Sequence, residues 1–382
     1  MECRNYVGQA SYLEMFKTNG DICRLGPIIG GAFNDSSATW RWAFYINICI
    51  AGAAAPACLL LIPSSPPRFE AKGLDRLKSL DYIGAILFAS GIACIIMILS
   101  FGGAIWNWND GRMITLYVCA GAAWLCFTFQ QWGSFLTTHR IFPIQFVSDR
   151  EMCILFCHTS IAISNLVVTI YMVPLFFQFV FADSALRSGL FVFAIAAAGI
   201  CAAGAGGAIF PKYTVYMVWF VVANAITLIG SALLTTITSH TSRGRICGFA
   251  ALQLIGCGVV VQLPFTVGQL KVQRKDIRSV TSFLTTAQMA GLAFSLGIAT
   301  CVFATRAANQ ITVALPDLPR KELYASLGGA GSALVDGLPA HEQELVLDII
   351  AKAVGRVFYL SVASSAFGLL SAVALKREKL IL

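Results

Sequence analysis

Charged residues are scarce in this sequence of 382 residues: Asp, Glu, Lys and Arg together make up 12%, whereas 57% of the residues are hydrophobic. Soluble globular domains carry roughly 25% charged residues, so the composition excludes an ordinary soluble enzyme or binding domain. It predicts a protein embedded in a lipid bilayer. The net charge of +8 therefore does not indicate nucleic-acid binding, because excess Lys and Arg on such a protein mark cytoplasmic loops and anionic lipid contacts.

Residues that hold metals or attack substrates are also sparse. The four histidines are scattered, with no HxxxH pair, and no GxSxG nucleophile motif occurs. The 13 cysteines form no CxxC pair and mostly lie inside apolar stretches, where cysteine packs as a small hydrophobic residue. We therefore expect no metal, no bound cofactor and no enzymatic activity.

Nine apolar segments are long enough to span a bilayer, since about 20 helical residues cross about 30 Å of hydrocarbon. They lie at 42–62, 82–102, 114–130, 153–177, 189–209, 215–238, 247–269, 281–304 and 356–375. None contains Asp, Glu or Lys, and the only arginine is Arg356 at the start of the last segment. The sequence thus predicts an all-α, polytopic membrane protein.

Basic residues alternate between the two sides of these segments. Fourteen lie on alternate connections and the C-terminal tail: Arg68, Lys72, Arg76, Lys78, Arg140, Arg150, Lys212, Lys271, Arg274, Lys275, Arg278, Lys376, Lys379 and Arg377. The opposite short connections carry four. The positive-inside rule places the first set and the C-terminus in the cytoplasm. The connection at about 306–355 then lies outside, and we expect its last part, His341–Val354, to run along the outer interface.

Nine spans with an inside C-terminus place the start of the first span outside, so part of a helix should precede it. Leu25–Phe33 is a run of nine apolar residues, about 13.5 Å of helix, which covers less than half of the hydrocarbon core. Lys17, Asp21 and Arg24 interrupt the chain upstream, and residues 1–24 do not have the pattern of a signal peptide. We interpret this region as a damaged or truncated helix.

Two motifs near the start carry a family resemblance. Gly26, Pro27, Gly30 and Gly31 form a GPxxGG motif, which suits close helix packing beside a kink, and the WRWAFYIN sequence follows at 40–47. Together they resemble helices five and six of the fourteen-helix drug:proton antiporter branch of the major facilitator superfamily, especially its fungal toxin-efflux members. A GxxxG packing contact without any role in transport would explain the glycines alone.

Further motifs extend the resemblance, in the same order, to the C-terminus. They are LDYIG at 80–84, FGG at 101–103 with WNW at 106–108, YMVPLFFQ at 171–178, and a GxG…QxP…Q pattern from Gly256 to Gln269. Met172 and Phe176 replace tyrosines that are usual in this family, and Leu263 replaces a second glutamine.

The resemblance implies a major-facilitator helical bundle that lacks helices one to four. It divides the chain into a non-family segment 1–24, a remnant of the N-terminal bundle at 25–62, a cytoplasmic linker at 63–81, two extra central helices at 82–130, and a C-terminal six-helix bundle at 152–382. It also implies efflux of hydrophobic drugs, toxins or secondary metabolites by alternating access, proton coupling through the absent helices, a monomer, and a plasma-membrane location. We accordingly expect this chain to transport weakly or not at all by itself.

The candidate substrate-lining residues are neutral polar side chains inside the spans: Asn165, Tyr171, Gln178, Gln262 and Gln269. Tyr171 and Gln178, like Gln262 and Gln269, are seven residues apart and bracket a proline, so each pair lies near one stripe of its helix. Such groups either line a path for weakly polar molecules or bond neighbouring helices together. His158 lies in a span near its cytoplasmic end, where we expect a solvated or backbone-bonded imidazole rather than a proton relay.

Two other classes remain open beside the transporter. An integral-membrane enzyme would need ligands or a nucleophile, which the motifs do not supply. A non-transporting membrane protein, or the product of a decayed gene or of a gene whose start was wrongly assigned, would account for the damaged helix at 25–33.

Overall fold

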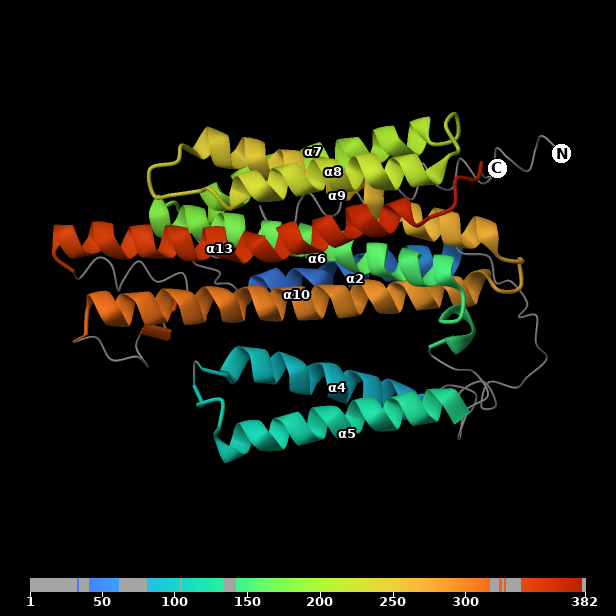
Figure 1. The fold of residues 1–382 in the computed structure, drawn as a ribbon, viewed down its shortest axis with the longest axis horizontal. Coiled ribbons are helices and arrows are strands. Elements are labelled where there is room, and N and C mark those ends of the chain that lie inside the picture. Colours follow the sequence, from blue (N-terminus) through green and yellow to red (C-terminus); the bar gives the residue numbers. More distant parts are fainter. Residues whose placement is uncertain are drawn as a thin grey trace.

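The structure, a computed structural model, describes residues 33, 41–61, 81–103, 105–133, 142–316, 323–324, 326–327 and 338–379. Long helices make up most of these residues (Figure 1). They are α2 (Trp42–Leu61), α4 (Tyr82–Phe101), α5 (Gly111–Gly133), α6 (Arg150–Val180), α7 (Ala185–Ile209), α8 (Tyr216–Leu234), α9 (Arg243–Lys271), α10 (Ile277–Ala314) and α13 (Ala340–Val373). The predicted all-α fold is confirmed for this part of the chain.

Each of the nine predicted spans coincides with one of these helices. Seven of them, α4 to α10, are long and apolar enough to cross a membrane. The other two predicted spans fall on α2 and on the second half of α13. The half-helix at 25–33, with Gly26, Pro27, Gly30 and Gly31, lies outside the described residues except for Phe33, as does most of the linker at 63–81.

Most of the described residues in the connection at 306–355 are helical, and they extend the two neighbouring helices. Helix α10 continues to Ala314, ten residues beyond its predicted span, and α13 begins at Ala340. His341–Val354 is therefore no separate interfacial helix but the first part of a continuous helix of 34 residues. Val346, Ile350 and Val354 are buried along it, so one face of this part packs into the bundle.

Local capping explains where several helices begin. The side chain of Asp149 accepts a hydrogen bond from the Glu151 amide (2.9 Å) at the start of α6, and Ser184 accepts one from the Arg187 amide (3.3 Å) at the start of α7. A side-chain acceptor at this position satisfies an amide that has no partner within the helix. These caps lie just outside the apolar runs, so they fix the helix starts that hydropathy alone leaves open.

Asp81, in the LDYIG motif, joins the two central helices. Its carboxylate caps α4 by accepting from the Gly84 amide (2.9 Å) and also accepts from the side-chain amides of Gln130 (2.8 Å) and Gln131 (2.6 Å) on α5. Gln131 in turn accepts from the amide of Phe142, in the segment that leads to α6 (3.2 Å). A Cβ on Gly84 would overlap the Asp81 carboxylate, which explains the glycine of this motif.

The helices from α6 to α13 form one bundle in which α6 contacts α7, α9, α10 and α13. The α4–α5 pair packs against this bundle through α10, where Leu99 meets Gly297, and Figure 1 shows the pair on the side of α10 away from α7 and α8. Helix α9 approaches α8 at Gly256 and α7 at Gly258, and a Cβ at either glycine would overlap backbone atoms of the neighbour. The GxG pattern thus allows two close helix contacts on opposite faces of α9.

Candidate substrate pocket

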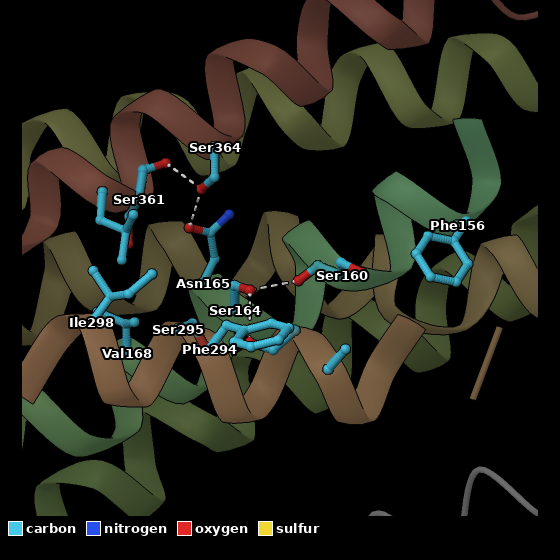
Figure 2. Close-up of a pocket in the computed structure, with 13 residues that line it drawn as sticks. Phe156, Ser160, Ser164, Asn165, Val168, Phe294, Ser295, Ile298, Ser361 and Ser364 are labelled. Atoms are coloured by element: carbon cyan, nitrogen blue, oxygen red, sulfur yellow. Dashed lines mark hydrogen bonds between the residues drawn. The ribbon is translucent and has the colours of Figure 1, made fainter. Parts of the chain in front are cut away.

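A cavity of about 320 Å³ lies between α6, α10 and α13 (Figure 2). Its polar lining consists of Ser160, Ser164, Asn165, Ser295, Ser361 and Ser364. Its apolar lining consists of Phe156, Val168, Ala290, Gly291, Phe294, Ile298 and Leu360. A cavity of this size, mostly apolar with a few convergent polar groups, has the character of a small-molecule site.

Small residues bring α6 and α10 together beside this cavity. A Cβ on Gly291 would lie 2.8 Å from the Ser160 carbonyl oxygen, so only glycine permits this approach. Across the same contact, Ser160 Oγ donates to the Ala287 carbonyl (2.9 Å) and Ser164 Oγ to the Gly291 carbonyl (3.1 Å). These bonds fix the two serines on the pocket wall.

Asn165 connects α6 to α13 at the pocket. Its amide nitrogen donates to Ser365 Oγ (3.1 Å), its amide oxygen accepts from Ser364 Oγ (3.0 Å), and only 1% of the residue is exposed. One turn further along α6, Thr169 donates to the side-chain oxygen of Gln253 on α9 (2.7 Å). The buried amides therefore hold α6 at the centre of the bundle.

His158 is neither solvated nor backbone-bonded, contrary to the expectation from sequence. It is fully buried, and its Nδ1 lies 3.4 Å from the Asn224 side-chain nitrogen on α8 while its Nε2 lies 3.3 Å from Ser371 Oγ on α13. Its ring packs on Phe220, with 4.5 Å between ring centroids. Since the Asn224 nitrogen can only donate, the Nδ1 atom accepts, and a neutral imidazole then donates from Nε2 to Ser371. This histidine joins three helices.

The structure does not gather the five predicted lining residues in one place. Asn165 lines the pocket. Gln178 donates to Ser188 Oγ on α7 (3.0 Å), and Gln269 donates to Thr281 Oγ1 on α10 (3.1 Å), so each of these amides bonds two helices together. Tyr171 is 43% exposed, and Gln262 also lies on an exposed face. A substrate-lining role for the five stays a prediction.

Sequence reasoning missed the pocket serines. A signal was present, because Ser361, Ser364 and Ser365 follow one another at helical spacing on α13, and Ser160 and Ser164 lie four apart on α6. Serine is also common at ordinary contacts between membrane helices. The spacing alone therefore did not distinguish a pocket wall from helix packing.

An ionic cluster ties the bundle together at the end that the charge rule places in the cytoplasm. Lys271, the last residue of α9, pairs with Glu151 on α6 and donates to the Tyr216 hydroxyl on α8 (2.8 Å). Tyr216 donates to Glu151 (3.1 Å), and Glu378 of the C-terminal tail lies 3.5 Å from Lys271. Three helix ends and the tail thus share one set of charges.

A second ionic cluster lies at the opposite end. Arg243, at the start of α9, donates two hydrogen bonds to Asp183 in the α6–α7 connection (3.1 and 3.2 Å), and its guanidinium lies 4.3 Å from the centroid of the Phe181 ring. Arg187 pairs with the same carboxylate at 3.3 Å. Helix α9 contributes its first residue to this cluster and its last residue to the other. The two clusters therefore lie at the two opposite ends of the bundle.

The described helices define an all-α, polytopic membrane protein with a small cavity near the middle of α6 and α10. The family model of the Major Facilitator Superfamily matches residues 24–296. The chain belongs to this superfamily.

Fungal transporters are among its relatives. The chain is 35% identical over 366 residues to "Efflux pump alnA" of Emericella nidulans, covering 94% of this chain and 66% of the pump. It is 35% identical over 358 residues to "MFS-type transporter pgmG" of Aspergillus terreus (93% and 64%) and 32% identical over 378 residues to "Phomenoic acid biosynthesis cluster MFS-type transporter" of Leptosphaeria maculans (94% and 60%). The chain therefore spans just under two thirds of the length of these curated relatives.

Proposed function

We propose that this protein exports hydrophobic small molecules, such as drugs, toxins or secondary metabolites, by alternating access. The relatives support this activity through their names, which describe efflux pumps and a transporter of a biosynthesis cluster. The observation that carries the proposal is the cavity of about 320 Å³ between α6, α10 and α13, which combines apolar walls with neutral hydrogen-bonding groups. Such a site suits a weakly polar organic molecule.

We also propose proton antiport, an orientation with the C-terminus in the cytoplasm, a monomeric state, a plasma-membrane location and no enzymatic activity. The excess of basic residues on alternate connections supports the orientation. Proton coupling rests on the family resemblance, because the nine predicted spans contain no Asp or Glu. Coupling acids would then belong to other helices than these nine.

The test is export of the neutral dye Nile red from yeast cells that lack their own efflux pumps. Two versions of the protein are compared: the 382 residues alone, and the same residues joined to the part of the alnA pump that they do not match. We expect weak export by the first version, since it spans just under two thirds of the length of its relatives, and clear export by the second. Absence of export by both versions, with both present in the membrane, would favour the non-transporting alternative.

A further inference from the structure

The pocket presents hydrogen-bond acceptors more than donors. Four of its five serine hydroxyls donate their single proton to oxygen atoms that cannot donate in return. These bonds run from Ser160 to the Ala287 carbonyl, from Ser164 to the Gly291 and Ser160 carbonyls, from Ser295 to the Leu292 carbonyl, and from Ser364 to the Asn165 side-chain oxygen. A hydroxyl group has one proton and two lone pairs, so these four serines retain only acceptor capacity for a ligand.

Ser361 is the exception among the pocket serines. Its side-chain oxygen is buried, only 1% of the residue is exposed, and this oxygen has no hydrogen-bond partner among the described residues. Figure 2 shows Ser361 on α13, above Ile298 of α10 and near Ser364. A buried hydroxyl without a partner is unfavourable. Rotation about the single χ1 bond of Ser361 would turn this hydroxyl toward the cavity, where a ligand oxygen would satisfy it.

The remaining lining limits the ligand's charge and shape. Among the residues that the structure describes, no Asp, Glu, Lys, Arg or His lines this pocket. A charged ligand would therefore lose its hydration without gaining an opposite charge. Phe156 and Phe294 offer aromatic surfaces for a flat apolar body.

We propose that this pocket binds neutral aromatic molecules through a hydroxyl group that accepts from Ser361 and donates to the lone pairs of a neighbouring serine. An ether oxygen accepts but cannot donate, and a carboxylate adds a charge that the lining does not compensate. The pocket therefore selects alcohols and phenols over their methyl ethers and over aromatic acids. That these molecules are the exported compounds rests on the proposed function, whereas their binding does not.

The test uses three probes with the same naphthalene body: 2-naphthol, 2-methoxynaphthalene and 2-naphthoate. Equilibrium dialysis against the full chain in lipid nanodiscs, corrected for protein-free nanodiscs, measures saturable binding at pH 7. We expect 2-naphthol to bind about tenfold more tightly than either other probe. This ratio corresponds to the loss of one hydrogen bond when that loss leaves a buried group without a partner. Equal or tighter binding of the ether or the acid would overturn the proposal.

Variants then assign the binding to this pocket. Ser361→Ala should weaken 2-naphthol binding about fivefold to tenfold, and Ser361→Cys, which keeps the side-chain size but donates poorly, should do the same. Ser90→Ala is the matched control, because Ser90 lies on α4, outside the pocket, and its hydroxyl donates to the Leu87 carbonyl. Unchanged affinity in both Ser361 variants would place 2-naphthol elsewhere and refute the assignment.

Binding and export are measured separately, so their failures are distinguishable. Selective 2-naphthol binding without Nile red export by either version of the protein would refute the proposed function and leave the pocket's preference intact. Nile red export without saturable 2-naphthol binding would refute the pocket's preference and leave the proposed function intact.

Discussion

Replacing Lys271 with methionine should destabilise the bundle, at the end where α9 stops, more than any exposed substitution there. The Lys271 and Glu151 side chains are only 13% and 12% exposed, and Tyr216, which bonds to both, is fully buried. Methionine keeps much of the length and apolar surface of lysine. The substitution therefore removes the charge and leaves the packing largely intact.

The expected cost follows from what remains around Glu151. Without Lys271, its carboxylate keeps the hydrogen bond from the Tyr216 hydroxyl but loses its paired cation. Breaking a buried ion pair on one side costs about 3–5 kcal/mol, and an exposed pair contributes about 0–1 kcal/mol. The two side chains of this pair are still roughly one eighth exposed, so the cost should lie somewhat below that of a fully buried pair. We expect the free energy of unfolding to fall by about 2–4 kcal/mol. At about 2 °C per kcal/mol, the apparent Tm should fall by about 4–8 °C.

The assay is thermal unfolding of the purified protein in detergent, with Lys212→Met as the control, because Lys212 is exposed in the α7–α8 connection. Glu151→Gln completes a double-mutant cycle. The double variant should lose clearly less stability than the sum of the two single variants, because each single change already breaks the same pair. Strict additivity, or equal shifts for Lys271→Met and Lys212→Met, would show that the cluster does not stabilise the bundle.

Two further substitutions have matched controls within the same structure. Gly258→Ala should cost about 1–3 kcal/mol in thermal unfolding, because the new Cβ overlaps the α7 backbone. Gly248→Ala on the same helix meets open space and should be neutral or stabilise by up to about 1 kcal/mol; equal effects would contradict the close contact. Arg243→Ala should cost about 1–3 kcal/mol by leaving the buried Asp183 carboxylate without its two-bond partner, whereas Arg187→Ala, at a side chain that is 60% exposed, should change stability by about 0.5 kcal/mol or less. A reversed order would mean that Arg187 is the main partner of this carboxylate.

The positions of the membrane helices were predictable because bilayer thickness fixes the length of an apolar run. The full lengths of α10 and α13 were not. Arg306 lies inside α10, and Asp348 and Lys352 lie inside α13, and hydropathy treats such residues as the end of a span. A helix that continues beyond the hydrocarbon needs no apolar residues, so its true end leaves no hydropathy signal.

The sequence predicted which side chains share a face of one helix, but not which side chains meet between two helices. The sequence placed Tyr171 and Gln178 on one stripe of α6, but it did not indicate that Gln178 faces α7 and bonds Ser188. The partners of His158 belong to α8 and α13. Which residues meet across helices depends on how each helix is rotated about its axis, and hydropathy does not encode that rotation.

The distribution of polar contacts along the bundle bears on the kind of molecule that the pocket between α6, α10 and α13 can hold. The described ion pairs lie in the clusters at the two ends and around Asp348 near the start of α13. The pocket between them is held by hydroxyls and the amide of Asn165. Charge is expensive in hydrocarbon, so a bundle built this way keeps its charges near the interfaces. A charged ligand in this pocket would lose its hydration without gaining an opposite charge, whereas neutral ligands would be distinguished by the direction of their hydrogen bonds. The pocket should therefore bind the neutral form of a compound more tightly than its anion, which binding measurements above and below the compound's own pKa would check.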